Sequence, residues 1–347
     1  MVILQNEMNK TIIIAEAGVN HNGDISMAKK LIDVAAYAKA DYVKFQTFKA
    51  EKLVSKFAMK ANYQKNRFKD SDNGQFNMLK NLELNHNDHL ELIEYSKKKR
   101  IKFLSTAFDI DGIKYLNSLK LDLFKIPSGE ITNYPYLNKI SLLNKPVILS
   151  TGMSNMDEIG DAIKVLTSNN LSINDIIILH CNTEYPTPMS DVNLNLMLSI
   201  KNKFNTKVGY SDHTLGIEVP IAAVSLGASV IEKHFTLDRN LKGPDHFSSL
   251  EPHDLKLMVE SIRNIEKAIS GSLSKEPTKS EFKNIKNVRK SIHFKKDMKK
   301  GELIYEKDLI TLRPATGINP MQWKNVINKK LKNDIKFGTS LKWNDIV

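Results

Sequence analysis

The sequence predicts an α/β fold: a (β/α)8 barrel followed by a small, mainly β domain. Over about the first 270 residues, eight short apolar runs alternate with helical patterns. Nearly every run ends in polar, reactive side chains. A doubly wound sheet also alternates, but it collects such residues at one switch point, whereas a barrel collects all eight strand ends around one site. The pattern therefore favours the barrel.

The eight runs are rich in Ile, Val and Phe, as expected of parallel strands buried on both faces. They cover residues 11–18, 42–48, 102–108, 123–130, 146–151, 175–182, 207–213 and 229–236. Helical patterns between them cover 26–40, 89–100, 156–167 and 252–269. Within 156–167, for example, Ile159, Ile163 and Leu166 follow the spacing of one helix face.

Charge and composition place a domain boundary near residue 272. The net charge is +12, and residues 273–347 contribute 18 Lys and Arg against 8 Asp and Glu, so that 10 of the 12 charges lie there. We expect a barrel over 1–270, a polar linker over 271–284 that contains Gly271 and Pro277, and a C-terminal domain over 285–347.

Composition also excludes several classes of protein. Cys181 is the single cysteine, which excludes an intrachain disulfide, cysteine metal clusters and CxxC redox chemistry. No apolar run is long enough to span a membrane, and the first ten residues lack the pattern of a signal peptide, so we expect a cytoplasmic protein. The basic C-terminal part could indicate nucleic-acid binding. Its few aromatic residues are not clustered for base stacking, so we expect no nucleic-acid partner.

Alternate residues of a strand share a face, so three pairs near strand ends are expected at the barrel mouth. They are Lys44 with Gln46, Ser128 with Glu130, and Glu232 with His234. His213 and His234 end neighbouring strands about 4.8 Å apart, close enough to share a divalent metal whose other ligands are water and substrate. The alternative is that these histidines only make hydrogen bonds in their loops.

Lysines occupy strands that should be buried, where a charge needs a partner. Lys44 and Lys125 suit an anionic ligand such as a small phosphorylated acid. Lys233 precedes His234 and therefore faces the other way, so we expect it to reach solvent at the barrel rim. Hydroxyl groups that would join the anion site are Thr106, Ser128, Ser150 and Ser211.

Loops after the strands supply further candidates. Glu16 precedes a tight loop containing Gly18 and the pair Asn22–Gly23, and it is either a general base, a ligand for a sugar hydroxyl, or a carboxylate near a helix start. Tyr185 and Asp245 lie in proline-containing loops after the sixth and eighth strands.

Taken in order, these segments resemble the sialic acid synthase family. The matching motifs are IAEAGVNHNGD (14–24), VKFQTFKA (43–50), FKIPSGE (124–130), LSTGM (149–153), HCNTEYPTP (180–188), YSDHT (210–214), IEKHFTLD (231–238), GPDH (243–246), RKS (289–291), KKGE (299–302) and RPATGI (313–318). The resemblance is collinear from about residue 11 to the end.

The resemblance implies a (β/α)8 barrel with a C-terminal antifreeze-like (SAF, β-clip) domain. It implies an N-acetylneuraminate synthase that joins phosphoenolpyruvate to N-acetylmannosamine and water and releases phosphate by C–O bond cleavage. The alternative is a legionaminate synthase that acts on 2,4-diacetamido-2,4,6-trideoxymannose. A more distant alternative is a barrel lyase that forms a Schiff base on Lys125 or Lys44. The family also implies a homodimer in which the C-terminal domain covers the partner's barrel mouth.

Residue roles follow from the resemblance by position. His213 and His234 match metal ligands, usually for manganese, with magnesium or cobalt as alternatives. Glu130 matches the carboxylate that handles the attacking water, and Glu16 is a second catalytic candidate near the sugar. Phosphoenolpyruvate contacts are expected from Lys44, Thr106, Lys125, Ser128, Ser150, Thr183 and Ser211. Sugar contacts are expected from Gln46, Tyr185, Asp245 and, from the partner chain, Arg313.

The sequence departs from the family pattern in three places. RPATGI replaces the commoner RPGNGI in the tail, and STAF replaces STPF at residues 105–108. The order CNTE at residues 181–184 leaves open whether Asn182 or Thr183 contacts the phosphate.

Overall fold

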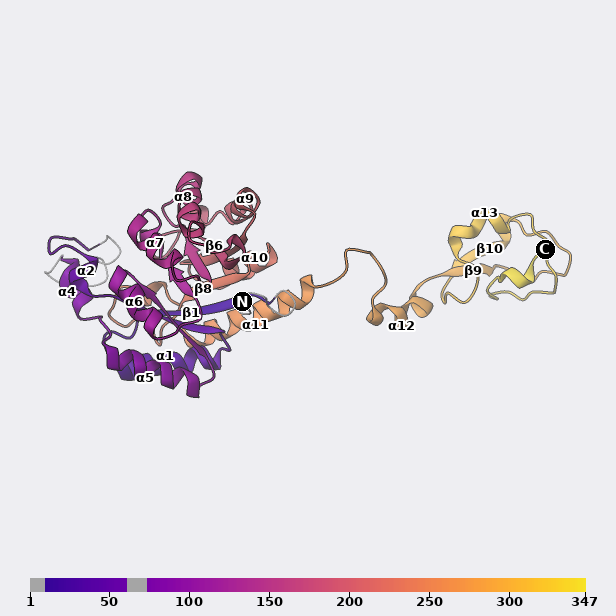
Figure 1. Ribbon diagram of the computed structural model, residues 1–347. Coiled ribbons are helices and arrows are strands. Elements are labelled where there is room, and N and C mark those ends of the chain that lie inside the picture. The colour runs from indigo at the N-terminus through magenta and orange to yellow at the C-terminus, as the bar shows by residue number, and fades with distance from the viewer. Residues whose placement is uncertain (1–9, 61–73) are drawn as a thin grey trace. The chain divides into compact units, whose positions relative to one another are not determined.

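The computed structural model describes residues 10–60 and 74–347, which form two compact units. The first unit is Met1–Gly271 and the second is Ser272–Val347 (Figure 1). The expectation that no signal peptide is present falls on residues 1–9, outside the described residues. Among the helices of the described part, none combines the length and the apolar character needed to cross a membrane.

Eight parallel strands form the centre of the first unit. Their order is β3-β2-β1-β8-β7-β6-β5-β4, and β3 and β4 at its two ends lie next to each other, so the barrel is nearly closed. The predicted (β/α)8 barrel is confirmed. The strands are β1 (Ile12–Gly18), β2 (Tyr42–Thr47), β3 (Lys102–Ala107), β4 (Phe124–Ile126), β5 (Val147–Ser150), β6 (Ile176–Cys181), β7 (Lys207–Asp212) and β8 (Val230–His234).

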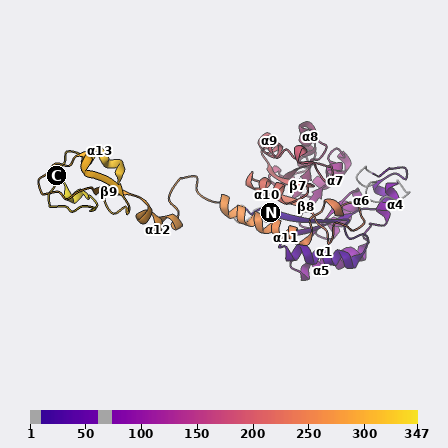
Figure 2. The same cartoon turned by 180° about the vertical axis from the view of Figure 1, so that it is seen from behind.

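Helices follow the strands and surround them (Figures 1 and 2). They are α1 (Ile25–Tyr37), α2 (Ala50–Leu53), α4 (Gln75–Lys80), α5 (His86–Lys98), α6 (Ile110–Ser118), α7 (Tyr134–Ser141), α8 (Met156–Thr167), α9 (Asn195–Phe204), α10 (Glu218–Ser225) and α11 (Pro252–Ile269). Local signals set their starts. Asn155 begins α8, for example, because its side chain and that of Glu158 bond each other's backbone N–H groups in a capping box.

Alternating strand side chains build two apolar layers, which leave only one end of the barrel for a site. Ile13 points outward into the layer under the helices, while Ile14 points into the barrel with Leu104, Ile148 and Ile177. Apolar side chains thus fill the barrel's interior. The polar interior positions, such as those of Glu16 and Lys44, come later along each strand, at the carboxyl end where barrel sites form.

Strand β4 is shorter than the predicted strand over residues 123–130. Ser128–Glu130 form a 3-10 turn directly after Pro127. Because proline has no N–H to donate, the strand ladder ends there. The expectation that Ser128 and Glu130 share a strand face is therefore wrong.

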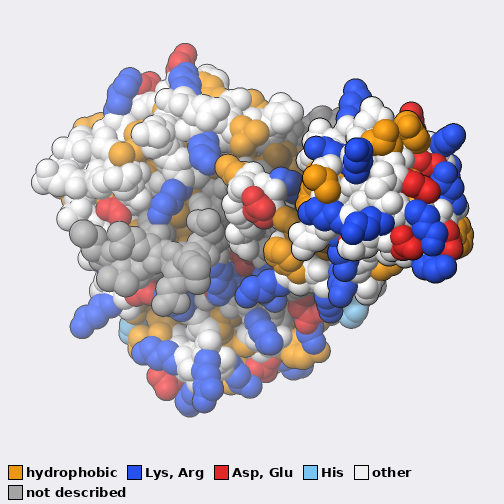
Figure 3. Space-filling view, turned by 90° about the vertical axis from the view of Figure 1, so that its right-hand side faces the viewer, with side chains coloured by type: hydrophobic (Ala, Val, Ile, Leu, Met, Phe, Trp, Pro, Cys, Tyr) orange, Lys and Arg blue, Asp and Glu red, His pale blue; other side chains and the backbone are white. Residues whose placement is uncertain are grey.

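The second unit is a small domain with a short antiparallel pair, β9 (Ser291–Phe294) and β10 (Leu309–Leu312), and a short helix α13 (Trp323–Val326). Its core includes Ile292, Phe294 and Leu341. Helix α12 (Lys279–Val288) begins within the expected linker and runs into the expected C-terminal domain, and Thr278 and Glu281 start it with a capping box. The surface of this unit that faces the viewer in Figure 3 shows more Lys and Arg than Asp and Glu, spread among apolar and uncharged side chains.

Candidate active site

A cavity of about 360 Å³ opens at the carboxyl ends of the strands, and every one of the eight strands contributes a side chain to it. It brings together thirteen of the fifteen residues that the sequence analysis singled out. They are Glu16, Lys44, Gln46, Thr106, Lys125, Ser128, Ser150, Thr183, Tyr185, Ser211, His213, His234 and Asp245.

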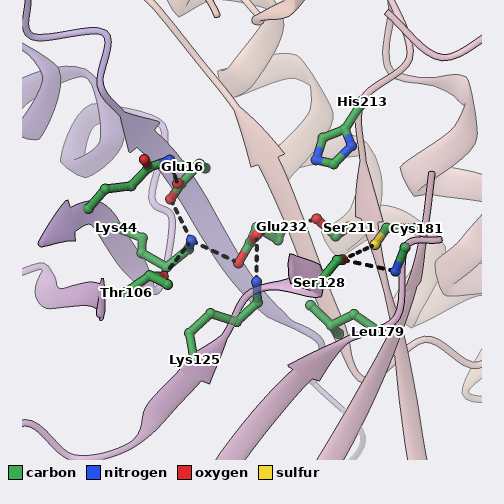
Figure 4. Close-up of polar contacts among 12 residues, drawn as sticks. Glu16, Lys44, Thr106, Lys125, Ser128, Leu179, Cys181, Ser211, His213 and Glu232 are labelled. Carbon is green, nitrogen blue, oxygen red and sulfur yellow. Dashed lines mark hydrogen bonds and ion pairs between the residues drawn. The ribbon is translucent and has the colours of Figure 1, made fainter. Parts of the chain in front are cut away.

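Four buried charges form a connected network on the cavity floor (Figure 4). Lys44 Nζ lies 2.9 Å from Glu16 Oε2 and 3.5 Å from Glu232 Oε2. Lys125 Nζ lies 3.2 Å from Glu232 Oε1. The Thr106 hydroxyl is 3.1 Å from Lys44 Nζ, and both lysines line the cavity.

Glu232 is the member of this network for which the sequence analysis assigned no role. Its only signal was that it shares a strand face with His234. It accepts hydrogen bonds from Lys125 and, at 3.3 Å, from the Ser211 hydroxyl. Burial alone would raise the pKa of Glu232, but Lys125 and Lys44 outweigh it and lower that pKa. Glu232 is thus the charged counter-ion that keeps two lysines buried in the site.

The pKa of Glu16 shifts in the opposite direction to that of Glu232. Burial raises its pKa, and Lys44 offsets this effect only in part. With Lys44, Lys125 and Glu232 charged, the network can take an anionic ligand against its two ammonium groups, and Glu16 can take up a proton as that anion enters.

Hydroxyl groups line the β4–β6 side of the cavity. Ser128 Oγ accepts a hydrogen bond of 2.9 Å from the backbone N–H of Gly152, and Ser150 Oγ is buried without a hydrogen-bond partner among the described residues. Thr183 lines the cavity, whereas the Asn182 side chain accepts a bond from the backbone of its own loop. The geometry therefore favours Thr183 over Asn182 as a ligand contact.

The two histidines meet across neighbouring strands, with ring centroids 5.6 Å apart. His213 Nδ1 contacts the Asn182 carbonyl, which can only accept, so Nδ1 carries the proton and the Nε2 lone pair faces the Tyr185 hydroxyl 3.1 Å away. His234 Nδ1 is buried and has no hydrogen-bond partner within residues 10–60 and 74–347, and Asp245 Oδ2 lies 3.9 Å from it.

A divalent metal fits this pair as an incomplete ligand set. Burial lowers the pKa of His213 to about 4 and that of His234 well below its usual value, so both rings are neutral and each offers a lone pair. Over residues 10–60 and 74–347, no group of three or more His, Cys, Asp or Glu is arranged to hold a metal ion. The remaining positions would therefore fall to water or substrate.

Burial also raises the pKa of Asp245 to about 7. This carboxyl group lines the cavity beside His234 and is neutral part of the time at physiological pH.

Lys233 does not reach solvent as expected. Its side chain is fully buried and contacts Asp212 Oδ2 at 2.5 Å and the Thr214 carbonyl at 2.6 Å. Asp212 Oδ1 in turn accepts a 3.0 Å bond from the Thr214 N–H. The prediction was wrong because the partner anion lies on the adjacent strand β7, directly opposite Lys233 in the register.

Two of the predicted site residues lie away from the cavity lining. Glu130 is half-buried on its 3-10 turn, where Asn133 Nδ2 donates to its Oε2 and burial raises its pKa. The adjacent Gly129 does line the cavity. Arg313 is exposed and belongs to the second unit.

Comparisons with known proteins agree with the fold. The model of the NeuB family matches residues 31–274, and that of the SAF domain matches residues 289–347. The N,N′-diacetyllegionaminic acid synthase of Campylobacter jejuni is 54% identical over 93% of this chain and 96% of its own length. The protein of the same name from Legionella pneumophila is 47% identical over 96% and 94%.

A solved structure gives the same result. The N-acetylneuraminic acid (sialic acid) synthetase of Leptospira borgpetersenii is 36% identical, with a TM-score of 0.69 over 80% of this chain and 90% of that one. The family match covers well over half of this chain, and the relatives span nearly all of it. The chain therefore belongs to the NeuB family and carries a C-terminal SAF domain.

Proposed function

We propose that this enzyme condenses phosphoenolpyruvate with 2,4-diacetamido-2,4,6-trideoxymannose and water, giving N,N′-diacetyllegionaminate and phosphate. The observation that carries the proposal is the single cavity that joins two buried lysines to two neutral histidines. The choice of sugar rests on the relatives. Those at 54% and 47% identity are named for legionaminate, and a solved structure named for sialic acid is at 36%. N-acetylmannosamine, the first expectation from the sequence, becomes the alternative acceptor.

Phosphoenolpyruvate would bind over the floor of the cavity. Lys44 and Lys125 present ammonium groups to its phosphate and carboxylate, and a charge-assisted bond to each is strong in a buried setting. Ser150 Oγ is buried and has no partner in the described part of the chain, so it gains an acceptor when the anion enters. Thr106, Ser128, Thr183 and Ser211 complete the expected contacts.

His213 and His234 would hold a divalent cation, with manganese as the expected metal. When bound, such an ion supplies Lewis-acid polarisation of the sugar's aldehyde oxygen. The Asn182 carbonyl contributes by fixing the His213 ring so that its Nε2 lone pair faces the cavity.

With the two substrates bound in these proposed positions, the reaction would proceed in three steps. The enol carbon of phosphoenolpyruvate forms the new C–C bond to the aldehyde carbon. The aldehyde C=O π bond opens and its oxygen takes up a proton, while the carbon that bears the phosphate becomes electron-poor. A water molecule adds to that carbon while a carboxylate takes its proton. The family resemblance assigns this step to Glu130, whose side chain lies off the cavity lining next to Gly129, which does line it. The C–O bond to phosphate breaks last, so the bridging oxygen leaves in phosphate and a keto acid remains.

Two measurements test this proposal. Phosphate release is expected when phosphoenolpyruvate and the trideoxy sugar are both present. A chelator should lower the rate of release, and Mn²⁺ should restore it better than other divalent ions. With phosphoenolpyruvate labelled at the bridging oxygen, the label is expected in phosphate. Full turnover by a metal-free preparation in excess chelator contradicts the metal role, and label retained in the sugar acid contradicts C–O cleavage.

We also infer that the active enzyme is a homodimer in which Arg313 of one chain reaches the sugar in the partner's barrel. Arg313 is exposed on the second unit, and a guanidinium group can hydrogen-bond the oxygens of an acetamido sugar. An Arg313→Ala chain mixed with a His234→Ala chain is expected to recover activity, because exchange rebuilds one intact site. No recovery after demonstrated subunit exchange excludes the arrangement.

A further inference from the structure

The cavity lining has a second, apolar part for which the chemistry above gives no use. Among the described residues, seven apolar side chains line it, all from segments that follow β1, β2 or β3. They are Val19, Leu53, Val54, Met78, Leu79, Leu82 and Phe108, which we call the apolar wall. They belong to one packed cluster with Phe48 and Ala50, so the wall is a supported surface.

The other cavity residues decide which part of the substrates meets this wall. The anionic groups of phosphoenolpyruvate need the ammonium groups of Lys44 and Lys125 on the floor. The aldehyde end of the sugar belongs beside His213 and His234 on β7 and β8. The distal part of the sugar, which carries C4 and C6, is left with the space beside the wall.

The two candidate acceptors differ at these carbons. N-acetylmannosamine carries hydroxyl groups at C4 and C6, whereas the trideoxy sugar carries an acetamido group at C4 and a methyl group at C6. A hydroxyl buried against aliphatic and aromatic carbon loses its bonds to water without replacement, whereas a methyl group gains contacts there.

We propose that the apolar wall is the specificity subsite for the acceptor, where it receives the C6 methyl group and the acetyl methyl group at C4. This inference rests on the proposed function, because it assumes condensation with phosphoenolpyruvate in the same cavity. One group's difference in an apolar pocket discriminates by about 10- to 100-fold. The wild-type ratio of kcat/KM for the trideoxy sugar over N-acetylmannosamine is therefore expected to be at least about 100, since two groups differ.

The test introduces hydroxyl groups into the wall without changing its shape. Val54→Thr is isosteric, and Phe108→Tyr adds one oxygen to a half-buried ring. Each variant is expected to lower the kcat/KM ratio by about 10-fold, with KM for phosphoenolpyruvate unchanged. Met153→Gln is the matched control, because Met153 lines the same cavity beyond β5, across the barrel from the wall. It is expected to leave the ratio as in the wild type.

The possible outcomes distinguish failure of the proposed subsite from failure of the proposed function. If the wild type uses the trideoxy sugar but both wall variants keep its ratio, the subsite is wrong and the proposed function stands. A wild-type preference for N-acetylmannosamine also overturns the subsite, while phosphate release still supports the condensation. No phosphate release with either sugar overturns both. A ratio that falls in the wall variants and not in Met153→Gln supports the subsite.

Discussion

The buried ion pair between Lys233 and Asp212 offers the sharpest test of how the histidines are positioned. The pair joins β7 to β8 on the face opposite the histidines, and His213 and His234 each follow one of its members. Replacing Lys233 with Met keeps the length and apolar stem of the side chain and removes its charge. We expect this change to destabilise the barrel and to weaken metal binding.

The size of the effect follows from complete burial. Both side chains have no solvent exposure, and the Lys233 ammonium group also contacts the Thr214 carbonyl. Removing one partner leaves the Asp212 carboxylate buried without its cation, which costs about 3–5 kcal/mol. Adding Asp212→Asn removes the orphan charge, so the double variant should recover more than half of the loss.

Two probes separate the barrel from the second unit. Far-UV circular dichroism follows the barrel helices during urea unfolding, while Trp323 and Trp343, both in the second unit, report on that unit by fluorescence. The dichroism transition of Lys233→Met should shift by about 3–5 kcal/mol. Its Mn²⁺ dissociation constant, measured by titration calorimetry, should rise by about 10- to 100-fold.

A control variant distinguishes positioning from general destabilisation. Thr206→Val removes a buried 3.0 Å hydrogen bond to Ile176 at the other end of β7, and should lower stability with Mn²⁺ affinity unchanged. The reasoning is refuted if Lys233→Met loses less than about 1 kcal/mol, or if Lys233→Met binds Mn²⁺ as the wild type does.

Three further predictions concern other parts of the barrel. Glu130→Gln should lower kcat by at least about 100-fold with little change in phosphoenolpyruvate binding, and steady-state kinetics with ligand titration check this. Gly152→Ala should raise KM for phosphoenolpyruvate several-fold, because a Cβ there would lie 2.6 Å from Thr183 and 2.9 Å from Ser128 Oγ; an unchanged KM would contradict it. Burial lowers the pKa of His21 to about 4 against 6.5 in the unfolded chain, so the unfolded chain binds the proton first and stability falls as pH drops from about 6.5 toward 4. His21→Asn should remove about 2 kcal/mol of the stability difference between pH 7 and pH 5, measured by urea unfolding.

Much of this protein could be read from short-range patterns. The eight strands were predictable because buried parallel strands need continuous apolar runs, such as the isoleucines at residues 12–14. The assembly of most site residues followed from the same fact, because a barrel carries all strand ends to one mouth. For Lys44, Lys125 and the two histidines, their positions near the strand ends were enough to predict that they lie in the site.

Contacts between residues far apart in sequence decided the rest. Lys125 pairs with Glu232, 107 residues later, and Lys233 pairs with Asp212 on the neighbouring strand. Whether a lysine near a strand end reaches solvent or stays buried depends on the anion that the register places opposite it, and strand spacing alone does not specify that anion. The apolar wall likewise exists only because segments after three different strands pack together over the mouth. The sequence by itself determined which chemistry gathers at the barrel mouth, and tertiary packing decided which charges pair there and which surface remains for the sugar.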